Sequence, residues 1–243
     1  MGASAARFGS LTWSPTILGG VTQTDHRLIR VGIVEDQPLF RSMLELTLAG
    51  VPGLQVIAAV GTVAAANQAF RPGVVDVALL DIDLPDGNGI ALGVTLRRAQ
   101  PRLGILLLSA HDAMDLLLDL PPDVASGWSY LSKTSSTSTD ELVRAVRATA
   151  AGHTTLDPAL LDRMEPRAGS SVARLTDRQY RVLRLLARGL SNAGIGEELG
   201  IAEKSVQNHI NTIYAALGID ADPARNPRVT AALRLLEEIG PAA

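Results

Sequence analysis

The chain has 243 residues, no cysteine and a formal net charge of −3, and 47% of its residues are hydrophobic. The length favours two domains, and the absence of cysteine excludes disulfides, thiolate nucleophiles and cysteine-ligated zinc, which fits a cytoplasmic location. No apolar run approaches the roughly 18 residues of a membrane span, so we expect no membrane contact. Residues 1–27 lack an apolar stretch followed by a cleavage site, and we expect a disordered extension there.

Five short apolar runs alternate with stretches of helical periodicity in the first 150 residues. The runs cover residues 28–34, 54–60, 74–80, 104–108 and 128–131. Strands that are apolar throughout are typical of a parallel sheet covered by helices on both faces. Pro38 can open the helix after the first strand, and Gly152 follows the helix that closes the unit. The sequence therefore predicts an α/β domain over residues 28–151.

The composition changes after this domain. Residues 152–172 are predicted to be a linker, because their last part is rich in small residues, proline and charge. A second domain, residues 173–243, opens with Thr176 and Gln179 in the spacing of a capping box, which predicts the start of a helix. Gly189 can end that helix, and Ser191 can cap the next one.

A third helix of this domain is predicted from about residue 203 to residue 217. Its apolar stripe consists of Val206, Ile210, Ile213 and Leu217. The opposite face carries Lys204, Gln207, Asn208 and Asn211. Three short helices in this arrangement are typical of a helix-turn-helix.

Acidic residues stand at the ends of two predicted strands. Glu35 and Asp36 follow the first strand, and Asp81 follows the third. Functional side chains gather beyond the carboxyl ends of parallel strands, so we expect these three carboxylates to converge. Like charges about 4 Å apart repel by roughly 4 kcal/mol at an effective dielectric of about 20, so the cluster needs a cation or a proton. All-oxygen ligation favours Mg²⁺, which leaves room for a phosphoryl oxygen.

The first domain resembles the receiver domains of two-component response regulators, in residues 79–89, 108–110 and 130–133. The resemblance implies a flavodoxin-like (βα)5 fold. It also implies that Asp81 is the phosphoacceptor, which a sensor histidine kinase phosphorylates, and that Glu35 and Asp36 are the acidic pair that binds Mg²⁺. The backbone carbonyl of Asp83 is implied as the remaining protein ligand of the metal.

The same resemblance assigns three further positions. Ser109 is the hydroxyl residue that ends the fourth strand, Lys133 is the lysine that neutralises phosphoryl oxygens, and Tyr130 is the aromatic switch. A simple packing role for Tyr130 stays open, because aromatic residues at strand ends are common. One region departs from the family pattern, since Pro121 and Pro122 interrupt the expected fourth helix. We expect that helix to be short or displaced, which leaves open which receiver surface dimerises.

The second domain resembles the LuxR-type helix-turn-helix of the NarL/FixJ family over residues 175–219. The resemblance implies an all-α, four-helix domain whose third helix lies in the major groove, with Gln207, Asn208 and Asn211 toward base edges and Lys204 toward a phosphate. Residues 172–219 hold 6 Lys and Arg against 4 Asp and Glu, or +2, whereas residues 28–150 hold 9 against 13, or −4. This asymmetry fits DNA contact by the second domain.

These patterns predict a transcription factor whose receiver, phosphorylated on Asp81, controls the binding of a homodimer to an inverted repeat near a promoter. A regulator that binds DNA without phosphorylation is an alternative, which the altered fourth helix supports. A haloacid dehalogenase-like phosphatase is a distant alternative, because Asp81, Ser109 and Lys133 are also similar to that family. It needs a later acidic pair at a strand end, and here Asp140 and Glu141 open a helix. We therefore expect no enzyme beyond the receiver's own phosphoryl transfer and dephosphorylation.

Overall fold

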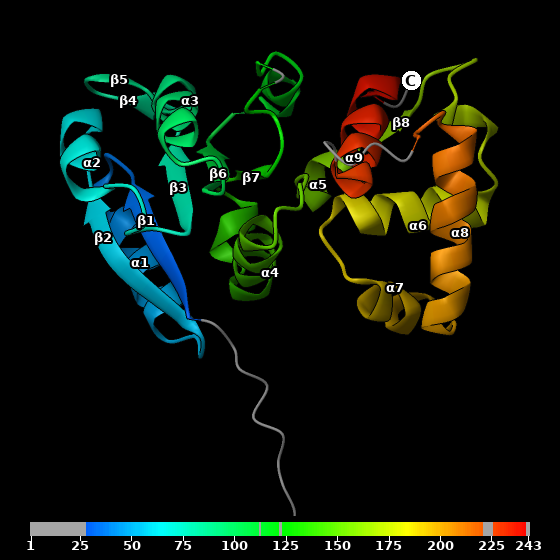
Figure 1. Ribbon diagram of the computed structural model, residues 1–243, viewed down its shortest axis with the longest axis horizontal. Helices are drawn as coiled ribbons and strands as arrows, with labels where there is room; N and C mark the ends of the chain where they lie inside the picture. Colours follow the sequence, from blue (N-terminus) through cyan, green and yellow to red (C-terminus); the bar gives the residue numbers. More distant parts are fainter. Residues whose placement is uncertain (1–27, 112, 122, 221–225, 242–243) are drawn as a thin grey trace, which may run out of the picture.

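The computed structural model of the chain describes residues 28–111, 113–121, 123–220 and 226–241 (Figure 1). The expected extension, residues 1–27, lies outside the described residues. A parallel five-stranded sheet is made of β1 (Ile29–Val34), β2 (Leu54–Val60), β3 (Val77–Asp81), β6 (Gly104–Ser109) and β7 (Trp128–Ser132). Its strand order is β2-β1-β3-β6-β7, which is the flavodoxin-like order. Each strand lies where an apolar run predicted one, although the third begins at Val77.

Helices cover both faces of this sheet (Figure 1). α1 (Pro38–Ala49) and α4 (Thr139–Ala150) pack on one face, and α2 (Val63–Ala69) and α3 (Gly89–Ala99) pack on the other. Along β3, Val77 and Leu79 belong to the core under α1 and α4, whereas Ala78 and Leu80 belong to the core under α2 and α3. The strands are apolar throughout because both of their faces are buried.

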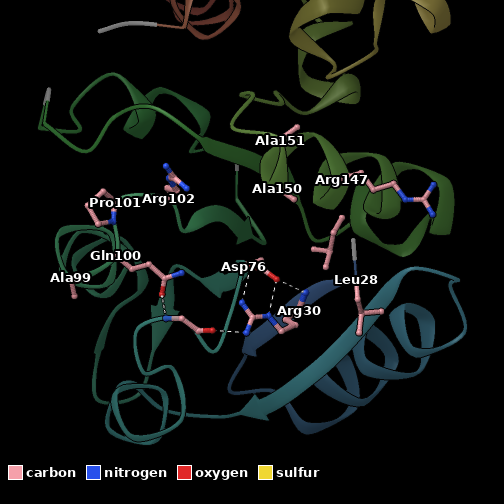
Figure 2. A pocket seen from close by; sticks show the side chains of 12 residues that line it. Leu28, Arg30, Asp76, Ala99, Gln100, Pro101, Arg102, Arg147, Ala150 and Ala151 are labelled. Carbon is pink, nitrogen blue, oxygen red and sulfur yellow. Dashed lines mark hydrogen bonds and ion pairs between the residues drawn. The ribbon is translucent and has the colours of Figure 1, made fainter. Parts of the chain in front are cut away.

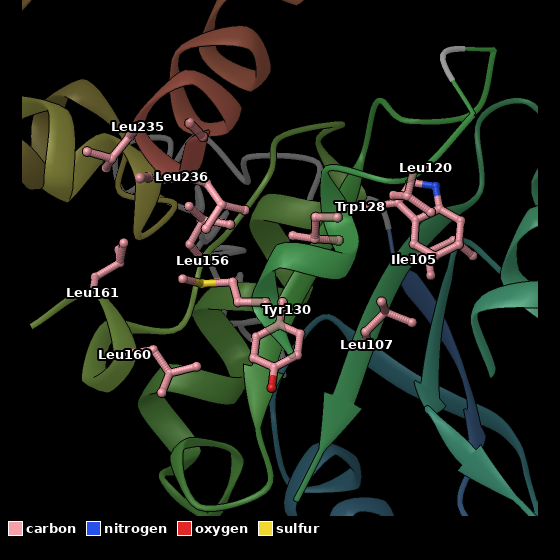
Figure 3. Packing of buried hydrophobic residues seen from close by; sticks show 14 of the residues in the cluster. Ile105, Leu107, Leu120, Trp128, Tyr130, Leu156, Leu160, Leu161, Leu235 and Leu236 are labelled. Atoms are coloured by element: carbon pink, nitrogen blue, oxygen red, sulfur yellow. The ribbon is translucent and has the colours of Figure 1, made fainter. Parts of the chain in front are cut away.

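The fourth helix of the receiver pattern is reduced to η1 (Met114–Leu117), a single 3₁₀ turn. The loop after it contains Pro121, which is half-buried, and leads into β7. The prediction of a short fourth helix is therefore confirmed. Leu117 and Leu120 are still buried and belong to the same hydrophobic cluster as Trp128 of β7 (Figure 3).

The second half is helical. It contains α6 (Asp177–Ala187), α7 (Asn192–Leu199), α8 (Glu203–Ala216) and α9 (Pro227–Glu238), preceded by η3 (Val172–Arg174). Thr176 caps α6 in a capping box with Gln179, and Ser191 caps α7, as the sequence predicts. Gly189 adopts the left-handed conformation just after α6, with φ at 80°. No helix in the described ranges is long and apolar enough to cross a membrane.

Short elements join the two halves. α5 (Pro158–Leu161) and β8 (Met164–Pro166) follow α4, within the segment predicted to be a linker. η2 (Ser135–Thr137) lies before α4, in the first half. β8 pairs antiparallel with β9 (Ile239–Pro241) at the end of the chain. The core under α2 and α3 continues through Leu156 and Leu160 to Leu235 and Leu236 of α9, so the two halves share one hydrophobic cluster (Figure 3).

Candidate functional site

Three carboxylates meet at the carboxyl end of the sheet. Glu35 directly follows β1, Asp36 comes next, and Asp81 is the last residue of β3. Each residue offers one carboxylate oxygen, and these oxygens lie within 4.8 Å of one another. Glu35 and Asp81 are buried, whereas Asp36 is exposed. The structure thus brings together the acidic residues that the sequence pattern pointed to.

Lys133 follows β7 and reaches into this cluster. Its Nζ donates hydrogen bonds to Glu35 Oε1 at 2.8 Å and to Asp81 Oδ2 at 3.0 Å. The ring of Phe40, in the first turn of α1, lies 5.2 Å from the same Nζ, within cation–π range. The sequence pattern did not point to Phe40. Its place two residues after Pro38, in the helix that leaves the acidic strand end, is the signal that could have found it.

Burial controls the ionisation of the cluster. Desolvation raises the pKa of Glu35, and the hydrogen bond from Lys133 opposes this rise. Desolvation likewise raises the pKa of Asp81, against the hydrogen bonds from Lys133 and from the backbone N–H of Asp83. Burial alone lowers the pKa of Lys133, but the hydrogen bonds to Glu35 and Asp81 and the negative charges of these acids together raise it. One lysine does not balance three carboxylates, so the cluster suits an additional cation.

The donor set fits a hard divalent cation. Glu35 Oε1 accepts hydrogen bonds from Lys133 and from the backbone N–H of Gln37 at 3.1 Å. Glu35 Oε2 is buried and has no hydrogen-bond partner in the described part of the chain. An unpartnered buried carboxylate oxygen is costly, and it is the ligand type that Mg²⁺ prefers. The side chain of Asp83 is exposed, and its carbonyl as a metal ligand stays a prediction.

Ser109 ends β6 at the same edge of the sheet. The register places Asp81 beside Leu108, so Ser109 lies one residue beyond the level of the phosphoacceptor candidate. Its buried hydroxyl accepts the backbone N–H of His111 at 3.1 Å. The backbone N–H of Lys133 donates to the Ser109 carbonyl at 2.7 Å, which joins the ends of β6 and β7.

Tyr130 lies within β7 and is completely buried (Figure 3). Its hydroxyl donates to the carbonyl of His111 and accepts the backbone N–H of Ala113 at 3.1 Å. Both partners belong to the loop that runs from Ser109 to η1. The hydroxyl of Tyr130 therefore binds that loop through two hydrogen bonds, while the ring packs in the apolar core.

Two residues shape the surroundings of Asp81. Gly89 opens α3 so close to it that a Cβ there would lie 1.9 Å from the Asp81 carbonyl oxygen, so only glycine fits. Asp86, in the hairpin of β4 (Asp83–Leu84) and β5 (Gly87–Asn88), accepts the first two backbone N–H groups of α2 at 2.8 and 2.9 Å. Those hydrogen bonds lower the pKa of Asp86. They fix the hairpin next to the acidic cluster.

A hollow of about 750 Å³ lies at the opposite end of the sheet (Figure 2). Three of its polar side chains, Arg30, Asp76 and Gln100, are hydrogen-bonded to one another or to nearby backbone groups. The Arg30 guanidinium donates to both carboxylate oxygens of Asp76 at 2.9 Å. Gln100 accepts the N–H of Gly73 at 2.9 Å and donates to the carbonyl of Val75 at 2.8 Å. These contacts stabilise the loops at this end of the sheet. The acidic cluster with Lys133 lies at the other end, where the strands have their carboxyl termini.

α8 presents the polar face that the sequence predicts. Its buried residues are Val206, Ile210 and Ile213. Its exposed polar residues include Lys204, Gln207, Asn208 and Asn211. Gln207 accepts a hydrogen bond from Asn192 of α7 at 2.8 Å and donates one to Asn211 at 2.9 Å, while Asn192 also accepts from Arg228 of α9 at 2.9 Å. This network, which the sequence pattern did not reveal, ties α8 to α7 and α9.

Comparison with known proteins decides the family. Residues 31–147 match the family model of the response regulator receiver domain, and residues 173–223 match that of the bacterial regulatory proteins of the luxR family. The chain belongs to the NarL/FixJ family of response regulators. The DNA-binding transcriptional activator DevR/DosR of Mycobacterium tuberculosis is 34% identical over 199 residues, which are 79% of this chain and 90% of that protein.

Two further proteins are similar along most of this response regulator. The transcriptional regulatory protein UhpA of Escherichia coli strain K12 is 31% identical over 195 residues, which are 80% of this chain and 94% of UhpA. The response regulator ChrA, of a heme-sensing two-component system, has a crystal structure, and its sequence is 30% identical to this chain. The comparison covers 86% of this chain and 99% of that chain, with a TM-score of 0.43. A receiver joined to a LuxR-type DNA-binding domain is a transcriptional regulator rather than a conventional enzyme.

Proposed function

We propose that this response regulator is switched by phosphorylation of Asp81. A sensor histidine kinase supplies the phosphoryl group, and a carboxylate oxygen of Asp81 attacks phosphorus in line, so that an O–P bond forms as the P–N bond to the kinase histidine breaks. The observation that carries the proposal is the contact of Lys133 with Asp81 at 3.0 Å, inside a cluster of acids with an unpartnered buried oxygen. Water later hydrolyses the acyl phosphate and restores Asp81.

The residues around Asp81 have two roles, binding of Mg²⁺ and neutralisation of the phosphoryl oxygens. Glu35, Asp36, Asp81 and the carbonyl of Asp83 would hold Mg²⁺. When bound, the cation supplies positive charge against the phosphoryl oxygens. Lys133 supplies a second positive charge from the side of β7, and its raised pKa keeps it protonated at neutral pH.

Ser109 and Tyr130 transmit the phosphorylation of Asp81 to the loop between β6 and η1. In the unphosphorylated chain the Ser109 hydroxyl accepts the N–H of His111, and the Tyr130 hydroxyl contacts the same loop. With a phosphoryl group on Asp81, the Ser109 hydroxyl donates to a phosphoryl oxygen, which draws the loop toward the site. Because the Tyr130 ring holds that loop, it moves with it, and this is the role of a switch residue.

The output is binding of a homodimer to promoter DNA. α8 enters the major groove with Gln207, Asn208 and Asn211 toward the bases, since amide side chains pair with adenine N6 and N7, and Lys204 contacts a phosphate. The exposure of all four side chains on α8 supports this arrangement. The relative DevR/DosR is described as a DNA-binding transcriptional activator. An operator made of an inverted repeat fits the symmetry of a dimer.

Phosphorylation is tested by incubating the chain with acetyl phosphate and Mg²⁺ and measuring its intact mass. The wild type should gain one phosphoryl group, Asp81→Asn should gain none, and the control Asp83→Asn should gain one because its backbone carbonyl is kept. A wild-type chain of unchanged mass that also binds no Mg²⁺ in a titration contradicts the proposal. That result would favour a regulator that binds DNA without phosphorylation.

A further inference from the structure

A short segment after α4 covers the outer edge of β7. β7 is the last strand of the sheet in the described residues, so one of its edges has no neighbouring strand. On that edge the backbone N–H of Tyr130 donates to the carbonyl of Thr155 at 2.8 Å, and the N–H of Thr155 donates to Ser129 Oγ at 3.0 Å. We call residues 153–157 the edge segment. It provides partners for backbone groups that an open sheet edge would leave exposed.

Asp157 ends the edge segment with a completely buried carboxylate. Its Oδ2 accepts the backbone N–H of Ser132 at 2.7 Å, and its Oδ1 accepts the N–H of Leu160 at 2.9 Å and so caps α5. Ser132 is the residue before Lys133, so this carboxylate holds the backbone that carries the lysine of the phosphorylation site.

The edge segment holds the DNA-binding domain at the same time. The backbone N–H of Leu156 points away from β7 and donates to the carbonyl of Ala187, the last residue of α6, at 2.7 Å. Leu156 and Ala187 are both completely buried. Gly189, just after α6, approaches so closely that a Cβ there would lie 2.5 Å from Thr155 Oγ1. The segment is therefore in contact with the receiver on one side and with α6 on the other.

We propose that Asp157 is a positioning residue that couples the phosphorylation site to the DNA-binding domain. The inference rests on the proposed function and deepens it. The path is short: Lys133 contacts Asp81, the adjoining Ser132 is bound by Asp157, and the preceding Leu156 holds the end of α6. Phosphoryl oxygens on Asp81 draw Lys133 to new positions, which shifts the end of β7 against Asp157 and loosens the hold on α6.

The two oxygens of Asp157 allow its two contacts to be separated. A serine caps a helix about as well as an aspartate does, but it has a single side-chain oxygen. Asp157→Ser therefore keeps an acceptor for the N–H of Leu160 and loses the bond to Ser132. Asp140→Asn is the matched control, since it also removes one carboxylate and Asp140 is exposed on the first turn of α4.

The contact of the edge segment with α6 is tested by the distance between two spin labels, one in each domain. The distance is measured in the full chain without phosphoryl donor. The chain has no cysteine, so Glu45→Cys on α1 and Glu197→Cys on α7, both at exposed positions, give a labelled parent directly. We expect one narrow distance distribution in this parent and in Asp140→Asn, and a broad one in Asp157→Ser. A narrow, unshifted distribution in a folded Asp157→Ser chain overturns the proposal.

Coupling also requires an effect in the reverse direction. If the phosphoryl group weakens the hold of Asp157, then losing that hold must favour the phosphorylated state by the same factor. With Mg²⁺ present, Asp157→Ser should bind beryllofluoride, a phosphoryl analogue, at least about fivefold more tightly than the parent, whereas a simple loss of stability would not tighten binding. Unchanged affinity in the variant overturns the coupling alone. A parent that binds no beryllofluoride contradicts the proposed function and the coupling with it.

A measurement without any variant covers the case in which Asp157→Ser does not fold. Hydrogen exchange of the backbone amides of Ser132 and Leu156 is followed in the wild type, with and without beryllofluoride and Mg²⁺. Both amides should exchange slowly in the free chain, because both are hydrogen-bonded, and faster in the loaded chain. Protection of both amides that does not change on loading overturns the proposal.

Discussion

Asp81→Asn should stabilise the receiver at neutral pH when divalent cations are absent. The Asp81 carboxylate lies within 4.8 Å of those of Glu35 and Asp36, and each such pair repels by about 3.5 kcal/mol at an effective dielectric of about 20. The contact with Lys133 at 3.0 Å is attractive by about 5.5 kcal/mol on the same scale. Asparagine removes slightly more repulsion than attraction, so we expect the free energy of unfolding to rise by about 1–2 kcal/mol.

The gain should depend on pH. Burial raises the pKa of Asp81 above its ordinary value, so the folded chain holds this proton more tightly than the unfolded chain. The resulting stability is fully present below the ordinary pKa of aspartate and is lost as the pH rises through the folded pKa. The advantage of Asp81→Asn should therefore be larger at neutral pH than in acid and disappear below about pH 4.

Urea unfolding in the presence of a chelator measures this difference. Trp128 is buried in the receiver and reports its unfolding when Trp13 is replaced by phenylalanine in every chain. Asp83→Asn is the control, because its side chain is exposed and its free energy of unfolding should change by less than about 0.5 kcal/mol. Added Mg²⁺ should stabilise the wild type and leave Asp81→Asn unchanged. An Asp81→Asn chain less stable than the wild type at neutral pH, without cations, would refute the reasoning.

Other substitutions test single contacts. Tyr130→Phe should lower the free energy of unfolding by about 1–3 kcal/mol, because two backbone groups of the loop before η1 lose their shared buried partner; an unchanged urea midpoint would contradict this. Thr176→Ala should destabilise the second domain by about 0.5–2 kcal/mol by removing the cap of α6, whereas Ala202→Ser should stabilise it, because α8 has no side-chain cap. An unchanged melting temperature for Thr176→Ala would argue against the first assignment, and a lowered one for Ala202→Ser would argue against the second. Asn208→Ala should cost about 1–3 kcal/mol on the specific operator and little on random DNA, while Lys204→Ala should weaken both alike and reduce the salt dependence. Equal losses on the two DNAs for Asn208→Ala, measured at one salt concentration, would place Asn208 away from the bases.

Elements with strong local signals could be predicted from the sequence. The strand that ends at Asp81 is apolar on both faces, so its burial and parallel pairing follow from composition alone. Thr176 and Gln179 form a capping box because their spacing allows each side chain to reach the other's backbone. The acids Glu35, Asp36 and Asp81 converge because parallel strands end at one edge of a sheet.

Contacts between distant backbone groups could not be predicted in this way. The N–H of Leu156 meets the carbonyl of Ala187, and neither group leaves a trace in the identity of a side chain. Asp157 precedes a proline, which reads as an ordinary helix cap, and only the fold shows that its second oxygen binds the N–H of Ser132. Gln207 is similar, because its polar character predicted exposure but not its hydrogen bond to Asn192.

Phosphorylation of Asp81 is expected to control binding to DNA. Genome-wide occupancy, measured for the wild type and for Asp81→Asn at equal protein levels under conditions that phosphorylate the wild type, tests it most directly. We predict that the wild type occupies sites sharing an inverted repeat and that Asp81→Asn lowers their occupancy by about tenfold, within the usual range of coupling between two sites. Equal occupancy of the same sites by both chains would contradict the claim.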